Sequence, residues 1–394
     1  MEEVFKLVSR IPDTGSVPEY LHPDHVRQVR TFHQTIPGYA PTPLVSLDDT
    51  AKDLGVGKIW VKDESKRFGL NAFKVLGGSY AMGKLMALRL GLEKPDFPTL
   101  TAGETRKKLG DITFVTATDG NHGRGVAWSA TQLGQKSVVY MPAGSARERL
   151  ENIRAAGAEA SIIDGNYDEA VRLAARQAAE QGWLLVQDTA WEGYTDIPQW
   201  IMEGYCTLGL EALEQLEEAP THIFLQAGVG SMAGALAGLF TAALNTKPTI
   251  VIVEPNKADC IFRTARADDG QLHTVTGAMA TIMAGLACGE PCSIGWDVLK
   301  ATASHFISCP DSAAAYGMRI LGNPVGSDKR IISGESGAAA FGCAAAILTD
   351  PSLAQMKDAL GLKPDSRLLF ISTEGDTDRE NYLAITWGGR FCNK

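Results

Sequence analysis

The sequence predicts an α/β protein with two open, mainly parallel, twisted sheets that carry helices on both faces. Short runs of β-branched and aliphatic residues alternate with longer helical segments along most of the chain, an order typical of parallel sheets covered by helices. Glycine-rich segments follow several of these runs, where open α/β sheets place their ligands. The length of 394 residues exceeds one average domain, so two domains are expected.

The first half of the chain supplies five predicted strands. Residues 58–62 form the first, and a helix over 78–90 opens after Gly77 and Gly78. The other strands are rich in β-branched or aliphatic residues and cover 113–117, 137–142, 160–164 and 183–187. Between them we expect an apolar helix, a charged helix and an amphipathic helix, over 125–133, 147–156 and 167–181.

The second half continues the alternation. A helix around 201–216 precedes the strand 223–227, which leads through a glycine loop into a helix rich in alanine and leucine and then the strand 249–253. Near the end, a buried helix over 337–348 precedes the strand 367–372. We expect a small domain, 92–197, inserted into a large domain formed by 1–91 and 198–394, with the ligand in the cleft between them.

Composition excludes several classes of protein. A hydrophobic content of 45% and a charged content of 21% are those of a soluble globular protein. The net charge of -9 is spread along the chain without a basic stripe, so nucleic acid is not expected as a partner. No apolar run approaches the ~20 residues of a membrane span, and the acidic start lacks the order of a signal peptide. We therefore expect a cytoplasmic protein without a membrane partner.

The cysteines and histidines predict neither a disulfide framework nor a metal site. The seven cysteines are odd in number and dispersed, so we expect free thiols, although a bridge from Cys260 to Cys288 or Cys292 stays open. Cys288 and Cys292 have metal-like spacing but no second Cys/His pair beside them. The histidines at 22, 25 and 33 are expected at the surface.

Lys74 stands between apolar neighbours and a predicted Gly-Gly-Ser turn, in the segment Asn71–Tyr80. An apolar pocket disfavours the ammonium form and leaves a nucleophilic amine. Lys74 is therefore a candidate for the lysine that binds pyridoxal phosphate through an imine. Taken alone, a lysine that packs or caps a helix explains the residue at least as well.

A second glycine-rich segment, 116–125, follows the strand at 113–117 and contains Thr118, Asp119, Gly120 and Asn121. Its glycines allow a tight bend that would bring Asn121 close to a flat ligand. A plain Asp/Gly/Asn turn between strand and helix is the alternative.

The third segment, 226–234, is a strand-to-helix loop with glycines at 228, 230 and 234. Its backbone amides and the following helix N-terminus would form a phosphate site. The same loop also matches a dinucleotide fingerprint, with Glu254 closing the next strand. This loop alone leaves nicotinamide and pyridoxal phosphate both open.

The three segments together resemble the fold-type II pyridoxal-phosphate enzymes, relatives of tryptophan synthase β and threonine dehydratase, in which they occur in this order. The resemblance covers about residues 40 to 380. Within that group the chain resembles the diaminopropionate ammonia-lyase family, in the stretches 71–81, 117–125, 283–291, 333–337 and 372–378. It departs from the dehydratases at Asp119, since their asparagine loop usually has Ser or Ala at that position.

The resemblance implies a role for each candidate residue. Lys74 would hold the cofactor covalently, Asn121 would donate a hydrogen bond to the phenolic oxygen, and Ser372, or with less support Thr373, would meet the pyridine nitrogen. Glu335 would lie near the ring. The phosphate would be surrounded by Gly228, Val229, Gly230, Ser231, Met232 and Gly234.

The resemblance also implies the reaction, the elimination of ammonia from 2,3-diaminopropionate to give pyruvate and a second ammonia. Lys74 would act as base on one face of the substrate, and we expect Asp119 to act as base or acid on the other face, so that both the L- and D-isomers would react. Asp188 could pair with a substrate ammonium or merely cap a helix. The other candidate substrate contacts are Ser79, Thr118 and Gly120.

Other functions stay open at this stage. A serine or threonine dehydratase of the same fold is the nearest alternative. A nicotinamide-dependent oxidoreductase would use the 228–234 loop and need no Lys74, whereas a non-catalytic amino-acid-binding relative would not need both Lys74 and Asn121. By resemblance we expect a homodimer whose small-molecule ligand is an amino acid.

Overall fold

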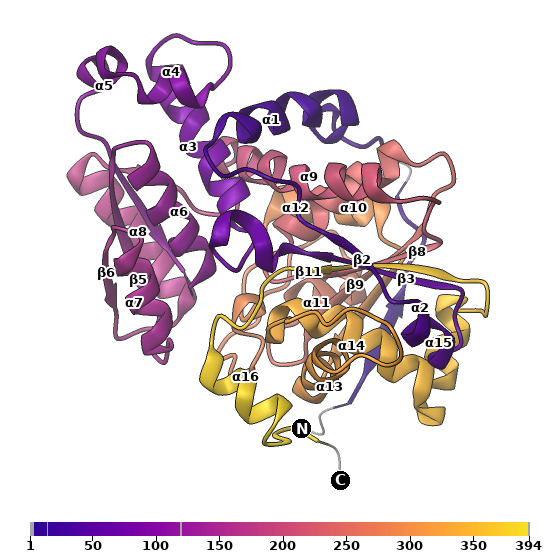
Figure 1. Ribbon diagram of the computed structural model, residues 1–394. Helices are drawn as coiled ribbons and strands as arrows, with labels where there is room; N and C mark the ends of the chain where they lie inside the picture. The colour runs from indigo at the N-terminus through magenta and orange to yellow at the C-terminus, as the bar shows by residue number, and fades with distance from the viewer. Residues whose placement is uncertain (1–3, 14, 119, 393–394) are drawn as a thin grey trace.

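The computed structural model describes residues 4–13, 15–118 and 120–392. It contains two separate sheets, each accompanied by helices (Figure 1). In the described residues no single helix is long and apolar enough to cross a membrane, and the one pair of segments that reaches this length, 335–349 with 351–360, is bent by 96°.

The larger sheet has seven strands in the order β1-β10-β9-β8-β11-β3-β2. The five central strands run parallel, and the two edge strands, β1 and β2, pair antiparallel. The strands are β1 Lys6–Ser9, β2 Leu44–Ser46, β3 Lys58–Asp63, β8 His222–Gln226, β9 Thr249–Pro255, β10 His305–Cys309 and β11 Arg367–Ser372. A mainly parallel sheet is therefore confirmed.

The smaller sheet has four strands in the order β6-β5-β4-β7, all parallel. They are β4 Thr113–Ala117, β5 Lys136–Met141, β6 Glu159–Ile162 and β7 Leu184–Leu185. All four lie between residues 92 and 197, whereas the seven strands of the larger sheet lie outside that range.

The α-helices alternate with the strands along much of the chain. They are α1 Pro23–Thr35, α2 Asp48–Asp53, α3 Val75–Arg89, α4 Phe97–Thr101, α5 Gly103–Leu109, α6 Asn121–Gln132, α7 Arg147–Ala155, α8 Tyr167–Gln181, α9 Asp196–Gln215, α10 Ser231–Ala243, α11 Cys260–Ala267, α12 Ser293–Thr302, α13 Asp311–Gly322, α14 Glu335–Thr349, α15 Ala354–Leu360 and α16 Arg379–Thr386. Four 3₁₀ turns lie at η1 Glu19–Leu21, η2 Glu64–Gly69, η3 Ala284–Leu286 and η4 Pro351–Leu353.

Helices cover both faces of the larger sheet, as predicted. Alternate residues of a strand point to opposite faces, and β8 shows this directly. Ile223 and Leu225 pack with α3, α9 and α10 in one core cluster, whereas Phe224 packs with α13 and α14 in another. Figure 1 shows these two helical layers on opposite sides of the sheet.

The parallel strands bring their carboxyl ends to one edge of the sheet. Gln226 ends β8 and leads into the glycine loop, and Ser372 ends β11 opposite Asp63 of β3. Helix α3 begins after η2, close to the same edge. It contacts α9 of the larger unit, which is the part that contains the seven-stranded sheet, and α6 of the smaller unit, which contains the four-stranded sheet. This edge is where α/β sheets build ligand sites.

Several predicted helix starts are wrong, and at α3 and α6 the glycines involved have another purpose. Helix α3 begins at Val75 rather than 78, so Gly77 lies inside it. A Cβ at Gly77 would lie 2.5 Å from a ring carbon of Tyr205, so the glycine permits close packing against α9. Helix α6 likewise begins at Asn121 rather than 125, and a Cβ at Gly125 would lie 2.9 Å from the backbone of Val75. Helix-to-helix contact, rather than a turn, explains these glycines.

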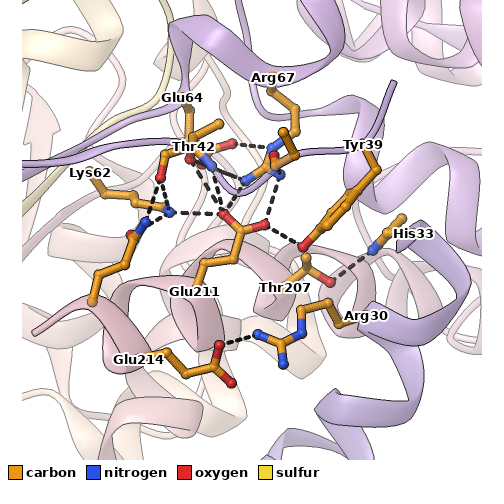
Figure 2. A network of polar contacts seen from close by, with 12 residues as sticks. Arg30, His33, Tyr39, Thr42, Lys62, Glu64, Arg67, Thr207, Glu211 and Glu214 are labelled. Atoms are coloured by element: carbon orange, nitrogen blue, oxygen red, sulfur yellow. Dashed lines mark hydrogen bonds and ion pairs between the residues drawn. The ribbon is translucent and has the colours of Figure 1, made fainter. Parts of the chain in front are cut away.

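A buried ionic network connects strand β3 and turn η2 to helix α9 (Figure 2). Glu211 receives hydrogen bonds from Lys62 Nζ at 2.8 Å and from both terminal nitrogens of Arg67, at 2.8 and 2.7 Å. Arg67 also donates to Glu64. Burial by itself raises the pKa of Glu211, but Arg67 and Lys62 outweigh it and hold the pKa at about 2. The network fixes the segment that leads toward Lys74.

His33 is buried, contrary to the prediction. Its ring nitrogens contact Thr207 Oγ1 at 2.8 Å and the carbonyl oxygen of Leu76 at 2.9 Å. Burial lowers the pKa of His33 to about 3, so the ring is neutral in the folded protein. Six of the cysteines are buried and Cys392 is exposed.

Candidate active site

Lys74 immediately precedes helix α3, at the carboxyl edge of the larger sheet. Its backbone packs against α6 at Gly125, where an added Cβ would lie only 3.2 Å from the Lys74 carbonyl carbon. The side chain is 17% exposed, and its Nζ lies 2.7 Å from Asp188 Oδ2. The amine therefore lies in a partly enclosed space that a ligand can reach.

Asp188 follows the short strand β7 and is buried. Besides Lys74, its carboxylate accepts a hydrogen bond from Tyr167 at 3.4 Å and lies 3.9 Å from His122 Nδ1. Burial alone raises the pKa of Asp188, but the charges of Lys74 and His122 and the hydrogen bond from Lys74 outweigh burial and hold the pKa below its ordinary value. Asp188 is thus a charged partner for a cationic amine.

A cavity surrounds the Lys74 amine. Its wall combines residues from segments that are far apart in the sequence and come from both sheets. The described residues that line it are Phe73, Lys74, Asn121, Asp188, Tyr205, the loop 226–233, Gly285, Leu286, Cys288, Ser336, Thr373 and Glu374.

The glycine loop between β8 and α10 forms one wall of this cavity. Gly230 precedes the helix with a φ of 96°, a conformation that favours glycine. A Cβ at Gly234 would meet the carbonyl oxygen of Gly295 at 2.8 Å, so this residue allows close packing against α12. The first N–H groups of a helix lack partners within that helix, and they favour an anion there. The wall therefore fits a phosphate group.

Asn121 begins helix α6 and lines the same cavity. Its Nδ2 donates a hydrogen bond to Glu374 Oε2. Glu374 in turn accepts the backbone N–H of Ser336 through Oε1 at 3.1 Å. The amide of Asn121 thus reaches from the smaller unit to the larger one beside the Lys74 amine.

The side chains of the two hydroxyl residues at the end of β11 have different surroundings. Thr373 lines the cavity, and its Oγ1 accepts a hydrogen bond from Gln226 Nε2 at 3.1 Å. The hydroxyl of Ser372 instead donates to Ser333 at 2.8 Å, and Ser372 is not among the described residues that line the cavity. The geometry favours Thr373, the less supported choice from the sequence, as the residue that faces a ring.

Five other predicted residues are not among the described residues that line the cavity, and Gly234 of the glycine loop is one of them. Ser79 is inside helix α3 and donates to the carbonyl oxygen of Leu76 at 3.3 Å. The hydroxyl of Thr118 accepts the N–H of Gly120 at 2.9 Å, so both shape the start of α6. Glu335 is buried and accepts from Asn381. Asp119 lies outside the described residues.

Sequence reasoning missed several residues of the cavity wall, among them Glu374 and Tyr205. Glu374 lies in a stretch that carried the family resemblance, 372–378, and its position next to Ser372 and Thr373 is the signal that could have singled it out. Tyr205 lies in the middle of the long helix α9, where nothing distinguishes it from a core tyrosine.

Glu254 does not fit the dinucleotide alternative. It is 1% exposed, and its two oxygens accept the backbone N–H groups of Ile261 and Phe262 at 2.9 and 2.6 Å. A carboxylate that caps helix α11 in this way is not presented to a ribose. In contrast, the lysine, the phosphate-binding wall and the asparagine all line one cavity, as pyridoxal phosphate requires.

Comparison with known proteins agrees with this geometry. A family described as "Pyridoxal-phosphate dependent enzyme" matches residues 35–374. Diaminopropionate ammonia-lyase of Escherichia coli (strain K12) is 52% identical over 398 residues, which cover 99% of each chain.

Two solved structures of the Escherichia coli diaminopropionate ammonia lyase are similar over nearly the whole chain. The complex with an aminoacrylate-PLP azomethine reaction intermediate has a TM-score of 0.91 and 49% identity, and covers 99% of both chains. The complex with D-serine has a TM-score of 0.92 and 48% identity, and covers 99% of this chain and 98% of that one. The chain belongs to the diaminopropionate ammonia-lyase family of pyridoxal-phosphate-dependent enzymes.

Proposed function

We propose that this enzyme eliminates ammonia from 2,3-diaminopropionate, after which water hydrolyses the unsaturated product to pyruvate and a second ammonia. The observation that carries the proposal is the shared cavity of Lys74, Asn121 and the 226–233 loop, in a chain 52% identical to a diaminopropionate ammonia-lyase. Bound pyridoxal phosphate supplies the electron sink that acidifies the substrate Cα proton. The remaining chemistry falls to the side chains around it.

Lys74 is the residue we assign to the covalent attachment and to proton removal at Cα from one face. The amine of Lys74 would accept that proton from the substrate. Asp188, 2.7 Å from Nζ, orients this amine and offers a negative charge to a cationic amino group. Diaminopropionate has two amino groups, which suits a cavity with a buried carboxylate.

We assign proton removal from the opposite face to Asp119, which would let the enzyme process the D- as well as the L-isomer. The Escherichia coli relative has been crystallised in complex with D-serine, which supports a pocket that accepts a D-amino acid. The roles of Ser79, Thr118 and Gly120 as substrate contacts find less support, because Thr118 and Gly120 hydrogen bond to each other and Ser79 to its own helix.

The cofactor would be held at three points. The phosphate would be held by Gly228, Val229, Gly230, Ser231 and Met232, which line the cavity. Asn121 would donate to the phenolic oxygen, and Thr373, rather than Ser372, would face the pyridine nitrogen through its hydroxyl. A hydroxyl partner leaves that nitrogen unprotonated, which favours elimination over transamination.

Steady-state rates on diaminopropionate and on serine test the proposal. We expect diaminopropionate to have a kcat/KM at least tenfold above that of serine, with pyruvate and two equivalents of ammonia as products. A preference for serine or threonine would make the protein a dehydratase instead.

We further propose that the enzyme is a cytoplasmic homodimer with the cleft between a 92–197 domain and the rest of the chain. The division of the two sheets at these boundaries supports the domain assignment. Light scattering should give about twice the chain mass of 42.1 kDa, and a monomer mass would contradict the homodimer.

A further inference from the structure

We propose that Glu374 is a positioning residue, which orients the side-chain amide of Asn121 toward the cofactor. The inference rests on the proposed function, in which Asn121 contacts the cofactor ring. Glu374 follows strand β11, is 1% exposed and lines the same cavity as Lys74. A buried carboxylate must be hydrogen-bonded, so the groups that donate to it indicate its role in the cavity.

The contacts of the carboxylate determine which end of the Asn121 amide faces it. Glu374 Oε2 accepts from Asn121 Nδ2 and, at 3.3 Å, from the hydroxyl of Thr377. Oε1 accepts the N–H of Ser336, at the start of α14. A carboxylate oxygen accepts hydrogen bonds, so the NH₂ end of the amide must point to it. An NH₂ group has two N–H bonds, and the second is directed away from Glu374, as donation to a phenolic oxygen requires.

The backbone around Glu374 is fixed by the segment that carries Lys74. Phe73 N–H donates to the Thr373 carbonyl at 3.1 Å, and Gly375 N–H donates to the Asn71 carbonyl at 3.0 Å. Gly334 N–H donates to the carbonyl of Glu374 itself at 3.0 Å. The carboxylate is therefore held rigidly relative to Lys74. Because Asn121 comes from the smaller unit, its bond to Glu374 sets the distance between the two halves of the cofactor site.

A double-mutant cycle on cofactor binding tests this role. Apoprotein prepared from the holoenzyme is titrated with pyridoxal phosphate, and the Kd and the visible absorbance of the bound cofactor are recorded for wild type, E374A, N121A and the double variant. Loss of a hydrogen bond to a charged group should weaken binding at least tenfold in each single variant. If Glu374 acts through Asn121, the double variant should match N121A within about twofold, and E374A should shift the absorbance band as N121A does.

Two further variants separate positioning from general damage. Glu374→Gln keeps the side-chain volume and one acceptor, so it should recover part of the affinity, and it replaces E374A in the cycle if that variant does not fold. Glu203→Gln is the matched control, since Glu203 is another buried glutamate, which contacts Gln199 and His25 outside the cavity lining of the described residues. It should leave the Kd unchanged.

Additive losses, with the double variant weakened by the product of the two single effects, would overturn the inference, as would an unchanged Kd in E374A. Wild-type protein that binds no pyridoxal phosphate would instead contradict the proposed function. An unchanged Kd in N121A would remove the assigned role of Asn121, and with it this inference.

Discussion

Lys74 Nζ and Asp188 Oδ2 lie 2.7 Å apart, although 114 residues separate them in the sequence. Lys74 comes from the start of α3 and Asp188 from the loop after β7, so the pair joins the two sheets at the cavity. A charged hydrogen bond between a reactive amine and a buried carboxylate controls both the position and the charge of that amine.

Replacement of Asp188 by asparagine should lower kcat/KM for diaminopropionate at least tenfold. The variant keeps the shape but loses the negative charge that orients the Lys74 amine and attracts a cationic amino group. Steady-state kinetics with spectroscopic confirmation of bound cofactor measure the effect. Asp259→Asn is the matched control, because Asp259 is equally buried but hydrogen bonds to Ser308 and Arg263. Wild-type rates in the Asp188 variant would refute its assigned role.

Replacement of Asp119 by asparagine should abolish turnover of one isomer of diaminopropionate and spare the other. The Cα protons of the D- and L-isomers point to opposite faces, and Asp119 is assigned to one of them. Separate kcat/KM values for the two isomers, before and after the substitution, measure this selectivity. Equal losses on both isomers would contradict a face-specific base.

The sequence singled out the lysine, the asparagine and the glycine loop, which line one cavity in the structure, because each lies at a glycine-rich junction where local chemistry is unusual. It was insufficient where a residue's task depends on distant contacts. Gly77 looked like part of a turn, but it is a contact point between α3 and α9. Ser372 and Thr373 are adjacent hydroxyl residues, and the alternation of side chains along an extended segment decides which one faces the cavity.

The edge strands illustrate a second limit. β1 and β2 have four and three residues and are partly exposed, so they carry little hydrophobic pattern of their own.

His33 looked like a surface residue beside two other histidines, yet its partners Thr207 and Leu76 come from two other helices. Such burial follows from tertiary packing, which the local sequence does not encode.

Replacement of Glu211 by alanine should destabilise the protein by about 3–5 kcal/mol, because it leaves Lys62 and Arg67 buried without their shared carboxylate. Chemical denaturation gives the free energy of unfolding. Glu214→Ala, three residues further along α9, is the control. Its carboxylate is 51% exposed where it pairs with Arg30, so the loss there should stay below about 1 kcal/mol. Similar losses at both positions would argue against the buried network.

Glu335 should make the stability of the protein fall as the pH rises from about 4.5 to 7. Burial, with the neighbouring charge of Glu374, raises the pKa of Glu335 from its ordinary value of 4.5 to about 7. The folded state therefore holds this proton more tightly than the unfolded state, and that advantage is complete below 4.5 and lost as the pH passes 7, a change of about 3 kcal/mol.

Unfolding free energies of wild type and Glu335→Gln at pH 5 and pH 8 measure this contribution. The glutamine variant cannot ionise, so its stability relative to wild type should rise between the two pH values. A difference between the two proteins that does not change with pH would show that Glu335 does not titrate in this range.

The most direct measurement of the central claim is the visible spectrum of the purified holoenzyme before and after borohydride reduction, followed by peptide mapping. We predict a yellow protein whose colour is bleached by reduction, with the pyridoxyl label on Lys74 and no label at that position in Lys74→Ala. A protein that stays colourless after incubation with pyridoxal phosphate, or a label on a different lysine, would contradict the account.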